Sequence, residues 1–457
     1  MVVARLLAPR DYGIIGLATL YVGLVTLLAD SGIGSSVVTL RSLKSRQISQ
    51  LHVLSGLVGT LLFLLSCLLA WPIARFFETP QLPPIIMVMS SLMAIAGWQS
   101  VPDALLQKQF RFRFLALRDM LRGLAGAAGT IVLALLGFQY WALAIGPVIG
   151  GALALTLTLG FQRISLGWPR LAELREAIAF SAHTLSGRLV WYAYSNADFL
   201  VAGKVLSTAS LGAYTLAWSL ANVSVEKVST LVGRVTPSFF SAAQSDPVML
   251  RSYLGTLTQA IALAAFPVSV GIALVASDFV PAVLGPRWIP AVAPLIPLSL
   301  YAGLRSLTPI LTIVLRVTGD QRFNLVVGLV TLAVMPVVFY VGSTWGTVGI
   351  AYGWVIGYPF LVIPLFARVF SRLSIGPMTY LGWLRPALTC TLLMAGVVSL
   401  MRLLLASAWP VPMRLALCVV AGAATYAGAL FLFFRPTVRY LLGSIRGSAS
   451  ATPVVVD

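Results

Sequence analysis

The strongest constraint on this chain is a recurrence of apolar stretches about 20 residues long, separated by short polar connections, along almost its whole length. A helix of about 20 residues spans the ~30 Å hydrocarbon core of a bilayer, and no aqueous fold hides so much apolar surface. The 457 residues are 59% hydrophobic and only 10% charged, whereas soluble domains are roughly a quarter charged. The sequence therefore predicts an all-α polytopic membrane protein.

Thirteen spans are predicted, with connections that alternate between the two sides of the membrane. Their ranges are 12–38, 52–76, 83–104, 119–138, 141–162, 177–203, 211–236, 252–277, 291–316, 323–342, 346–368, 386–406 and 412–434. Most of the 31 lysines and arginines fall on one side, including the groups at 41–46, 108–118, 163–175, 368–372 and 435–446. By the positive-inside rule this side is cytoplasmic, together with the C-terminal tail 435–457, which its composition predicts to be disordered.

An internal repeat relates two halves of the chain. The segment LAPRDYG at 7–13, followed by Leu17 and Ala18, matches LSTASLG at 206–212, followed by Leu216 and Ala217, at a constant offset of 199. Two six-helix lobes follow, and because six is even they run the same way through the membrane, as a parallel repeat. By this register the first helix of the first lobe is expected to be largely missing, through truncation or a misplaced start codon.

The predicted organisation follows from this repeat. It consists of an N-terminal lobe over 1–162, with a stub of the first helix and five spans, an amphipathic cytoplasmic linker over 163–176, a C-terminal lobe of six spans over 177–368, two additional spans within 386–434, and the tail 435–457.

Several function classes are disfavoured by the residues themselves. The three cysteines lie in apolar spans, and with only two histidines no CxxC or HExxH spacing occurs, so neither a metal nor another cofactor is predicted. The net charge of +18 is explained by topology, and nucleic-acid binding is not expected. There is no phosphate loop, nucleophile elbow or pair of carboxylates in a cytoplasmic loop, so the protein is not expected to be an enzyme.

A series of short motifs covers nearly the whole chain. They are LLAPRDYG at 6–13, DSGIG at 30–34, LLQKQFRF at 105–112, YWAL at 140–143, GKVL at 203–206, LGAY at 211–214, VTPSFFS at 235–241, GPRWIPA at 285–291 and WGTVGIA at 345–351. In this order and spacing the chain resembles the Wzx-like polysaccharide and oligosaccharide flippases of the colanic-acid-exporter type, whose superfamily also contains multidrug and toxin exporters. Two departures are the absent first helix and Lys204, where an arginine is expected.

The resemblance implies a function. It implies two six-helix lobes with two further helices, and alternating access of a central cavity to an oligosaccharide carried on undecaprenyl diphosphate. It places the protein in the bacterial inner membrane, in the synthesis of exopolysaccharide, capsule or O-antigen, with a polysaccharide polymerase and export machinery as partners. A cation-coupled drug or metabolite exporter of the same superfamily is the alternative. A membrane polymerase or ligase usually needs a large external loop, and the longest predicted one, 278–290, is short.

Charged side chains inside spans are costly in a bilayer and usually face a cavity or one another. The sequence has such groups at Arg122, Arg188, Asp198, Glu226, Lys227, Arg234 and Arg305. Arg188 and Arg305 lie nearest the middle of their spans, and their guanidinium forks suit phosphate or carboxylate oxygens. Arg122 and Lys227 are further predicted cavity cations, although Arg122, within a turn of the cytoplasmic end of its span, can also snorkel to the headgroups.

Two acids are the predicted ion-coupling groups. Asp198 and Glu226 are placed to load and release H+ or Na+ as access alternates, because a carboxylate in low dielectric changes its cation affinity with its surroundings. A purely structural ion pair between Glu226 and Arg188 is an equal alternative.

Overall fold

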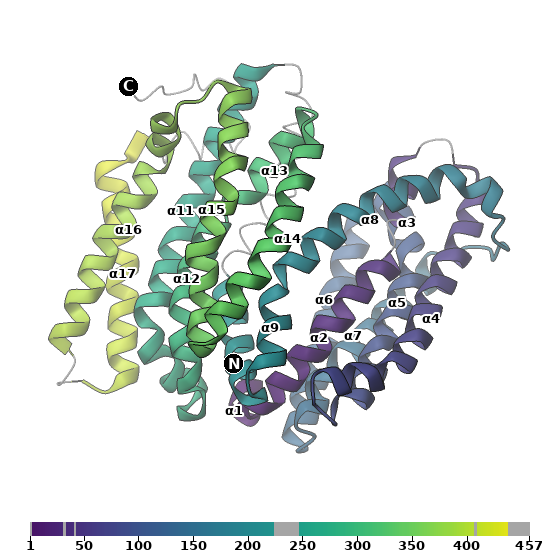
Figure 1. Cartoon of the computed structure of the whole chain (residues 1–457), viewed down its shortest axis with the longest axis horizontal. Helices are drawn as coiled ribbons and strands as arrows, with labels where there is room; N and C mark the ends of the chain where they lie inside the picture. Colours follow the sequence, from purple (N-terminus) through teal and green to yellow (C-terminus); the bar gives the residue numbers. More distant parts are fainter. Residues whose placement is uncertain (1, 31–32, 41–42, 224–245, 406–408, 437–457) are drawn as a thin grey trace. The chain divides into compact units, whose positions relative to one another are not determined.

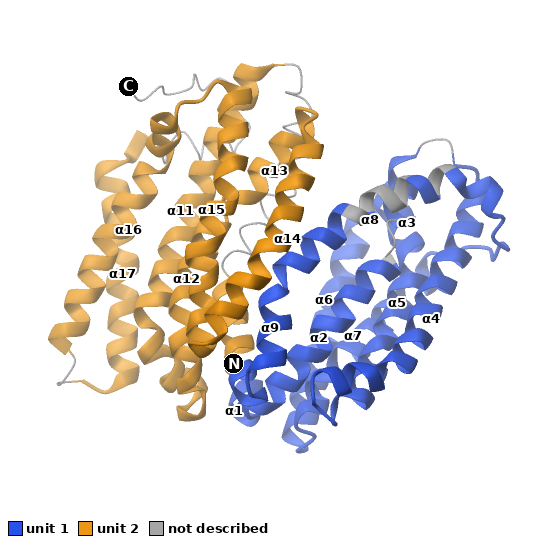
Figure 2. Ribbon diagram, in the orientation of Figure 1, with its two compact units in different colours: residues 1–212 blue, residues 213–457 orange. Residues whose placement is uncertain are grey.

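The computed structural model describes residues 2–30, 33–40, 43–223, 246–405 and 409–436, and the regular structure in these ranges is helical (Figure 1). The chain divides into two compact units, Met1–Gly212 and Ala213–Asp457 (Figure 2). Helix α8 (Arg175–Ser195), which begins inside the predicted linker 163–176, and helix α9 (Ala197–Val205) fall in the first unit. There α8 packs on α2 (Pro9–Asp30) and α3 (Ile33–Thr39).

Unit 1 is built from helices that pack mainly as sequence neighbours. The helices are α1 (Val2–Leu6), α2 (Pro9–Asp30), α3 (Ile33–Thr39), α4 (Ser45–Phe76), α5 (Leu82–Lys108), α6 (Phe112–Leu135), α7 (Tyr140–Phe161), α8 (Arg175–Ser195) and α9 (Ala197–Val205), with a 3-10 turn at Leu171–Leu174. The largest contacts join α4 to α5 and α6 to α7, and α5 also packs on α2 and α7. Ile33, Val37, Leu51 and Val101 form a buried cluster where α3, α4 and α5 meet.

Unit 2 contains α11 (Pro247–Phe279), α12 (Val292–Arg305), α13 (Thr308–Val317), α14 (Gln321–Ser343), α15 (Gly346–Leu373), α16 (Pro377–Leu405) and α17 (Val411–Phe433). Asp246 caps α11 by accepting hydrogen bonds from the backbone N–H groups of Val248 and Met249, at 2.9 and 3.1 Å. A π-helical turn at Val280–Leu284 and a 3-10 turn at Pro286–Ala291 carry the chain from α11 to α12.

The two C-terminal helices are joined to α11 by one buried carboxylate. Asp278, at the end of α11, accepts hydrogen bonds from Arg414 of α17, with Nε at 3.1 Å, and lies 3.6 Å from Arg402 Nε of α16. The hydroxyl of Tyr426 donates to the carbonyl of Leu263 at 2.7 Å further along the same contact. Both predicted additional spans are therefore packed on the core of unit 2.

Within the described ranges, ten helices are long and apolar enough to cross a bilayer. They correspond to ten of the thirteen predicted spans, and large apolar side chains such as Leu68 and Leu403 stand exposed on them, as lipid-facing residues would. The prediction of an all-α polytopic membrane protein is confirmed.

The three other predicted spans differ for identifiable reasons. Helix α6 is long enough, but Arg113, Arg118, Asp119 and Arg122 make it highly charged. The predicted span 177–203 is interrupted at Asn196, whose side-chain amide donates to the carbonyl of Tyr192 at 2.9 Å and so competes with the helical ladder. The span 211–236 starts within a helix over 208–223 and then leaves the described residues.

The glycines related by the offset of 199 lie against each other's helix start. A Cβ on Gly13 would come within 1.9 Å of the carbonyl oxygen of Thr208, and one on Gly212 within 1.7 Å of the carbonyl oxygen of Pro9. Pro9 and Thr208 are themselves related by the same offset. The contact is thus reciprocal, as a two-fold relation between the repeated segments requires, and only glycine permits so close an approach.

Candidate functional site

Arg305 lies at a break within a membrane span. Helix α12 ends at Arg305 and α13 begins at Thr308, although the whole stretch Pro286–Val317 is a single candidate span. Pro309 lacks a backbone donor, and the Ser306 hydroxyl donates to the Gly303 carbonyl at 2.6 Å, so the helical ladder is interrupted here. Irregular backbone at membrane depth is tolerated where it is buried in protein or lines a cavity.

The indole ring of Trp218 lies against this arginine, and further aromatic rings pack behind it. Its guanidinium lies 5.8 Å from the ring centroid of Trp218, and Nη1 donates to Asn222 Oδ1 at 3.2 Å. Beyond Trp218, Tyr301 and Trp354 stack at 4.7 Å between centroids. Unit 2 therefore places a half-buried cation beside an aromatic wall, which consists of half-buried Trp218 with buried Tyr301 and Trp354 packed behind it. A guanidinium beside an indole suits an anionic group attached to a ring with an apolar face.

Arg188 and Asp198 lie on either side of the second helix break, in unit 1. Arg188 is half-buried on α8, and Asp198 is fully buried in the first turn of α9, where the helix N-terminus favours a carboxylate. Ten residues separate them, about 15 Å along a continuous helix, so they are not neighbours on one helical face.

The remaining predicted site residues have different outcomes. Arg122 is exposed on α6 and lies almost three turns after the start of this helix at Phe112, while its role as a cavity cation stays a prediction. Glu226, Lys227 and Arg234 lie outside the described residues, and so does the predicted pair between Glu226 and Arg188.

One buried polar network was not predicted. Arg118 was assigned to a cytoplasmic connection, but it lies within α6, only 5% exposed, and forms an ion pair with Asp103 of α5. It also donates to Asp119 Oδ1 at 2.8 Å and to Thr158 Oγ1 of α7 at 3.1 Å. The sequence did contain a signal for this network, because Asp103 and Asp119 lie near the ends of consecutive predicted spans and could pair with a nearby arginine. This arginine is neutralised by its neighbours, as buried charges must be.

Lys204, which stands where the family pattern has an arginine, pairs with the α4–α5 turn. Its Nζ donates to Glu78 Oε1 at 2.7 Å and to the carbonyl of Phe76 at 2.9 Å, near the C-terminal end of α4. The hydrogen bond and charge of Lys204 lower the pKa of Glu78. Lys204 thereby joins the end of α9 to the α4–α5 turn.

Interrupted spans, intramembrane cations and two helical units define a multi-pass membrane protein of the transporter class. Residues 2–293 match the family described as polysaccharide biosynthesis protein, and the chain belongs to this family.

Relatives and folds agree with this assignment. The chain is 25% identical to the lipopolysaccharide biosynthesis protein WzxC of Escherichia coli K12, over 81% of this chain and 75% of WzxC. It is 26% identical to the teichuronic acid biosynthesis protein TuaB of Bacillus subtilis 168, over 62% of this chain and 59% of TuaB. The inward closed structure of the lipid II flippase MurJ has a similar fold, with a TM-score of 0.75, 14% identity and 96% coverage of both chains.

Proposed function

We propose that this protein is a flippase that moves an oligosaccharide, carried on undecaprenyl diphosphate, across the bacterial inner membrane for surface polysaccharide synthesis. The relatives named for lipopolysaccharide and teichuronic acid biosynthesis, and the fold shared with a lipid II flippase, support this assignment. The single structural observation that carries it is Arg305 at the break between α12 and α13, beside the aromatic wall.

The substrate explains why such a site is needed. A diphosphate and a hydrated sugar must cross hydrocarbon, while the polyprenyl tail can stay in lipid. Arg305 offers charge-assisted donors to phosphate oxygens, and the face of half-buried Trp218, which buried Tyr301 supports from within, can pack against the C–H face of a sugar ring. Arg188, Arg122 and Lys227 are proposed as further cavity cations.

Translocation by alternating access breaks no bond, so we assign no catalytic residue. Buried Asp198, with Glu226, is proposed to couple the movement to H+ or Na+. The basic connections and the C-terminus are proposed to face the cytoplasm, with a polysaccharide polymerase and export machinery as partners.

The test compares Arg305→Gln with Arg316→Gln in a strain that lacks the chromosomal gene. Both changes remove one positive charge from the same span, but Arg316 is exposed at the end of α13. Because a charge-assisted hydrogen bond contributes about 1.5–3 kcal/mol, R305Q should lower polysaccharide export about tenfold or more, with lipid-linked repeat units accumulating on the cytoplasmic face. R316Q should support normal export.

Two controls complete this test. Membrane levels of both variants are compared by immunoblot, and R305K should retain part of the export, because charge survives while the planar fork is lost. Full export by R305Q at normal expression would contradict the role of Arg305. A gene deletion that causes no accumulation of lipid-linked units, but loss of drug efflux, would instead favour the exporter alternative.

A further inference from the structure

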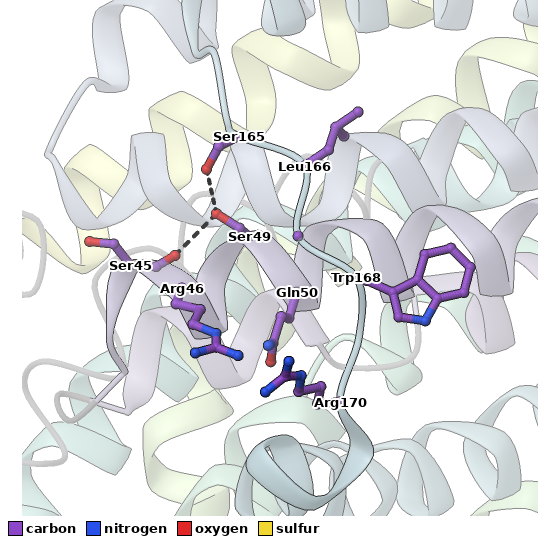
Figure 3. A pocket seen from close by; sticks show the side chains of 9 residues that line it. Ser45, Arg46, Ser49, Gln50, Ser165, Leu166, Trp168 and Arg170 are labelled. Carbon is purple, nitrogen blue, oxygen red and sulfur yellow. Dashed lines mark hydrogen bonds between the residues drawn. The ribbon is translucent and has the colours of Figure 1, made fainter.

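A cavity of about 380 Å³ lies in unit 1, where the N-terminal end of α4 meets the segment 163–170 (Figure 3). On the α4 side it is lined by Ser45, Arg46, Ser49 and Gln50. The segment is held against the helix by the hydroxyls of Ser49 and Ser165, which lie 2.7 Å apart. The cavity is thus a built feature of unit 1.

The segment 163–170 alternates between two faces, as extended backbone does. Ser165 faces Ser49, and Gly167 packs so closely on the same residue that a Cβ there would come within 3.0 Å of the Ser49 Cβ. The intervening Leu166 and Trp168 are 75% and 79% exposed, and Figure 3 shows both turned away from Ser49. An exposed tryptophan beside a leucine is typical of a membrane–water interface.

The length of α4 places this cavity at the headgroup level. Its 32 residues extend about 48 Å, whereas the hydrocarbon core is about 30 Å thick. The first turns of α4, Ser45 to Gln50, are mostly polar, whereas the predicted apolar span begins at residue 52. The part of α4 that exceeds the hydrocarbon thickness is therefore assigned to this end, in the polar region of the bilayer.

The charges at the cavity favour an anion. Arg46 Nη2 and Arg170 Nη1 each lie 3.5 Å from the same oxygen, Glu173 Oε1, at the outer limit of hydrogen bonding. Two cations share one carboxylate, which leaves one positive charge, and the N-terminus of α4 adds its own partial charge. Both guanidinium groups are largely exposed and retain donors for a phosphate.

The side chain of Gln50, which lines the cavity, has an oxygen that needs a hydrogen-bond donor from a bound molecule. It is 2% exposed, and its Nε2 donates to Glu173 Oε2 at 3.2 Å. Its Oε1 is buried and accepts no hydrogen bond from the described residues. A buried acceptor without a donor is costly, so a hydroxyl of a bound molecule would stabilise it.

We propose that this cavity binds the headgroup of an anionic glycerophospholipid that carries hydroxyl groups, as phosphatidylglycerol does. The phosphate lies between Arg46 and Arg170, a glycerol hydroxyl donates to Gln50 Oε1, and the acyl chains pass Leu166 and Trp168. Soluble phosphate and polyprenyl diphosphates could bind the two arginines in the same way. The exposed side chains of Leu166 and Trp168 favour a lipid over soluble phosphate. The amide oxygen of Gln50, which accepts a hydrogen bond from a hydroxyl group, favours a phosphoglycerol headgroup.

Native mass spectrometry of the full-length protein in detergent tests this site. Wild-type protein should bind phosphatidylglycerol at least about tenfold more tightly than phosphatidylcholine, and the double variant R46Q/R170Q should lose this preference. Q50L should lower the affinity for phosphatidylglycerol several-fold while leaving the affinity for phosphatidic acid, which lacks the glycerol, unchanged.

Matched variants and competitors keep the proposal falsifiable. R111Q/R113Q removes two exposed positive charges at the start of α6, outside the cavity, and should bind like wild type. R46K/R170K should retain most of the preference, which separates loss of charge from loss of folding. The proposal would be overturned if R111Q/R113Q lost the preference for phosphatidylglycerol as fully as R46Q/R170Q does. It would also be overturned if equimolar inorganic phosphate or geranyl diphosphate displaced phosphatidylglycerol.

Discussion

Asp320 lies in the turn between α13 and α14, where two arginines of α15 hold its carboxylate. Arg372 donates from Nε and Nη2 at 2.5 and 2.8 Å, and Arg368 donates from the same two nitrogens at 2.9 and 3.1 Å. These hydrogen bonds, first from Arg372 and then from Arg368, lower the pKa of Asp320 to about 2. The turn and the end of α15 are therefore held together by a charged carboxylate.

The depressed pKa predicts a pH-dependent contribution to stability. The carboxylate stabilises the folded state above the unfolded pKa of about 3.9, and this contribution is lost as pH falls through the folded value of about 2. Asp320→Asn should therefore lower the melting temperature at pH 6, and its difference from wild type should shrink between pH 4 and pH 2.

Thermal unfolding of the purified protein in detergent checks this expectation. Asp246→Asn is the matched control, because asparagine caps a helix as well as aspartate does and the change should have little effect. If the difference in melting temperature between D320N and wild type stayed constant down to pH 2, the charge of Asp320 would not be the source of the stabilisation.

At the scale of elements, the reciprocal contact between the repeated helix starts leaves no room for a side chain at either glycine. Backbone carbonyls occupy the space that side chains at Gly13 and Gly212 would need. Carbonyls held in helices cannot rotate away as a flexible side chain can, so even one methyl group must displace a helix.

Gly212→Ala is therefore expected to lower the free energy of unfolding by about 2–3 kcal/mol, at the upper end of overpacking effects. Gly123→Ala on α6 is the control, because a Cβ there has no atom within 4 Å in the described structure. The comparison is made by thermal unfolding and by the yield of monodisperse protein. If G212A and G123A had the same melting temperature and the same yield, the two helix starts could move apart without a loss of stability, and the prediction would be wrong.

At the scale of the whole molecule, the repeat predicts that equivalent connections lie on the same side of the membrane. In a chain whose three cysteines are replaced by alanine, Gln109→Cys and Gln321→Cys should react with an impermeant maleimide only after the membrane is opened. Phe138→Cys and Thr344→Cys should react in intact spheroplasts. Labelling of positions 109 and 321 from opposite sides would contradict the parallel repeat.

The candidate site was only partly predictable. Arg305 was identified from its depth in a span, because charge within an apolar run is visible in the sequence. The helix break that follows it, and its contacts with Trp218 and Asn222, were not predicted. Arg118 shows the limit more clearly, since local composition placed it in a connection, while its partner Asp103 lies on another helix.

Hydropathy and basic-residue distribution alone predicted helices that cross a bilayer, and the offset of 199 related the two halves. Hydropathy, charge distribution and internal similarity depend only on the order of residues along the chain, so the sequence alone reveals them. Tertiary structure alone decided which charges meet: Asp278 with Arg402 and Arg414, and Asp320 with Arg368 and Arg372. An ion pair depends on the distance between side chains of different helices, and that distance is set by how the helices pack.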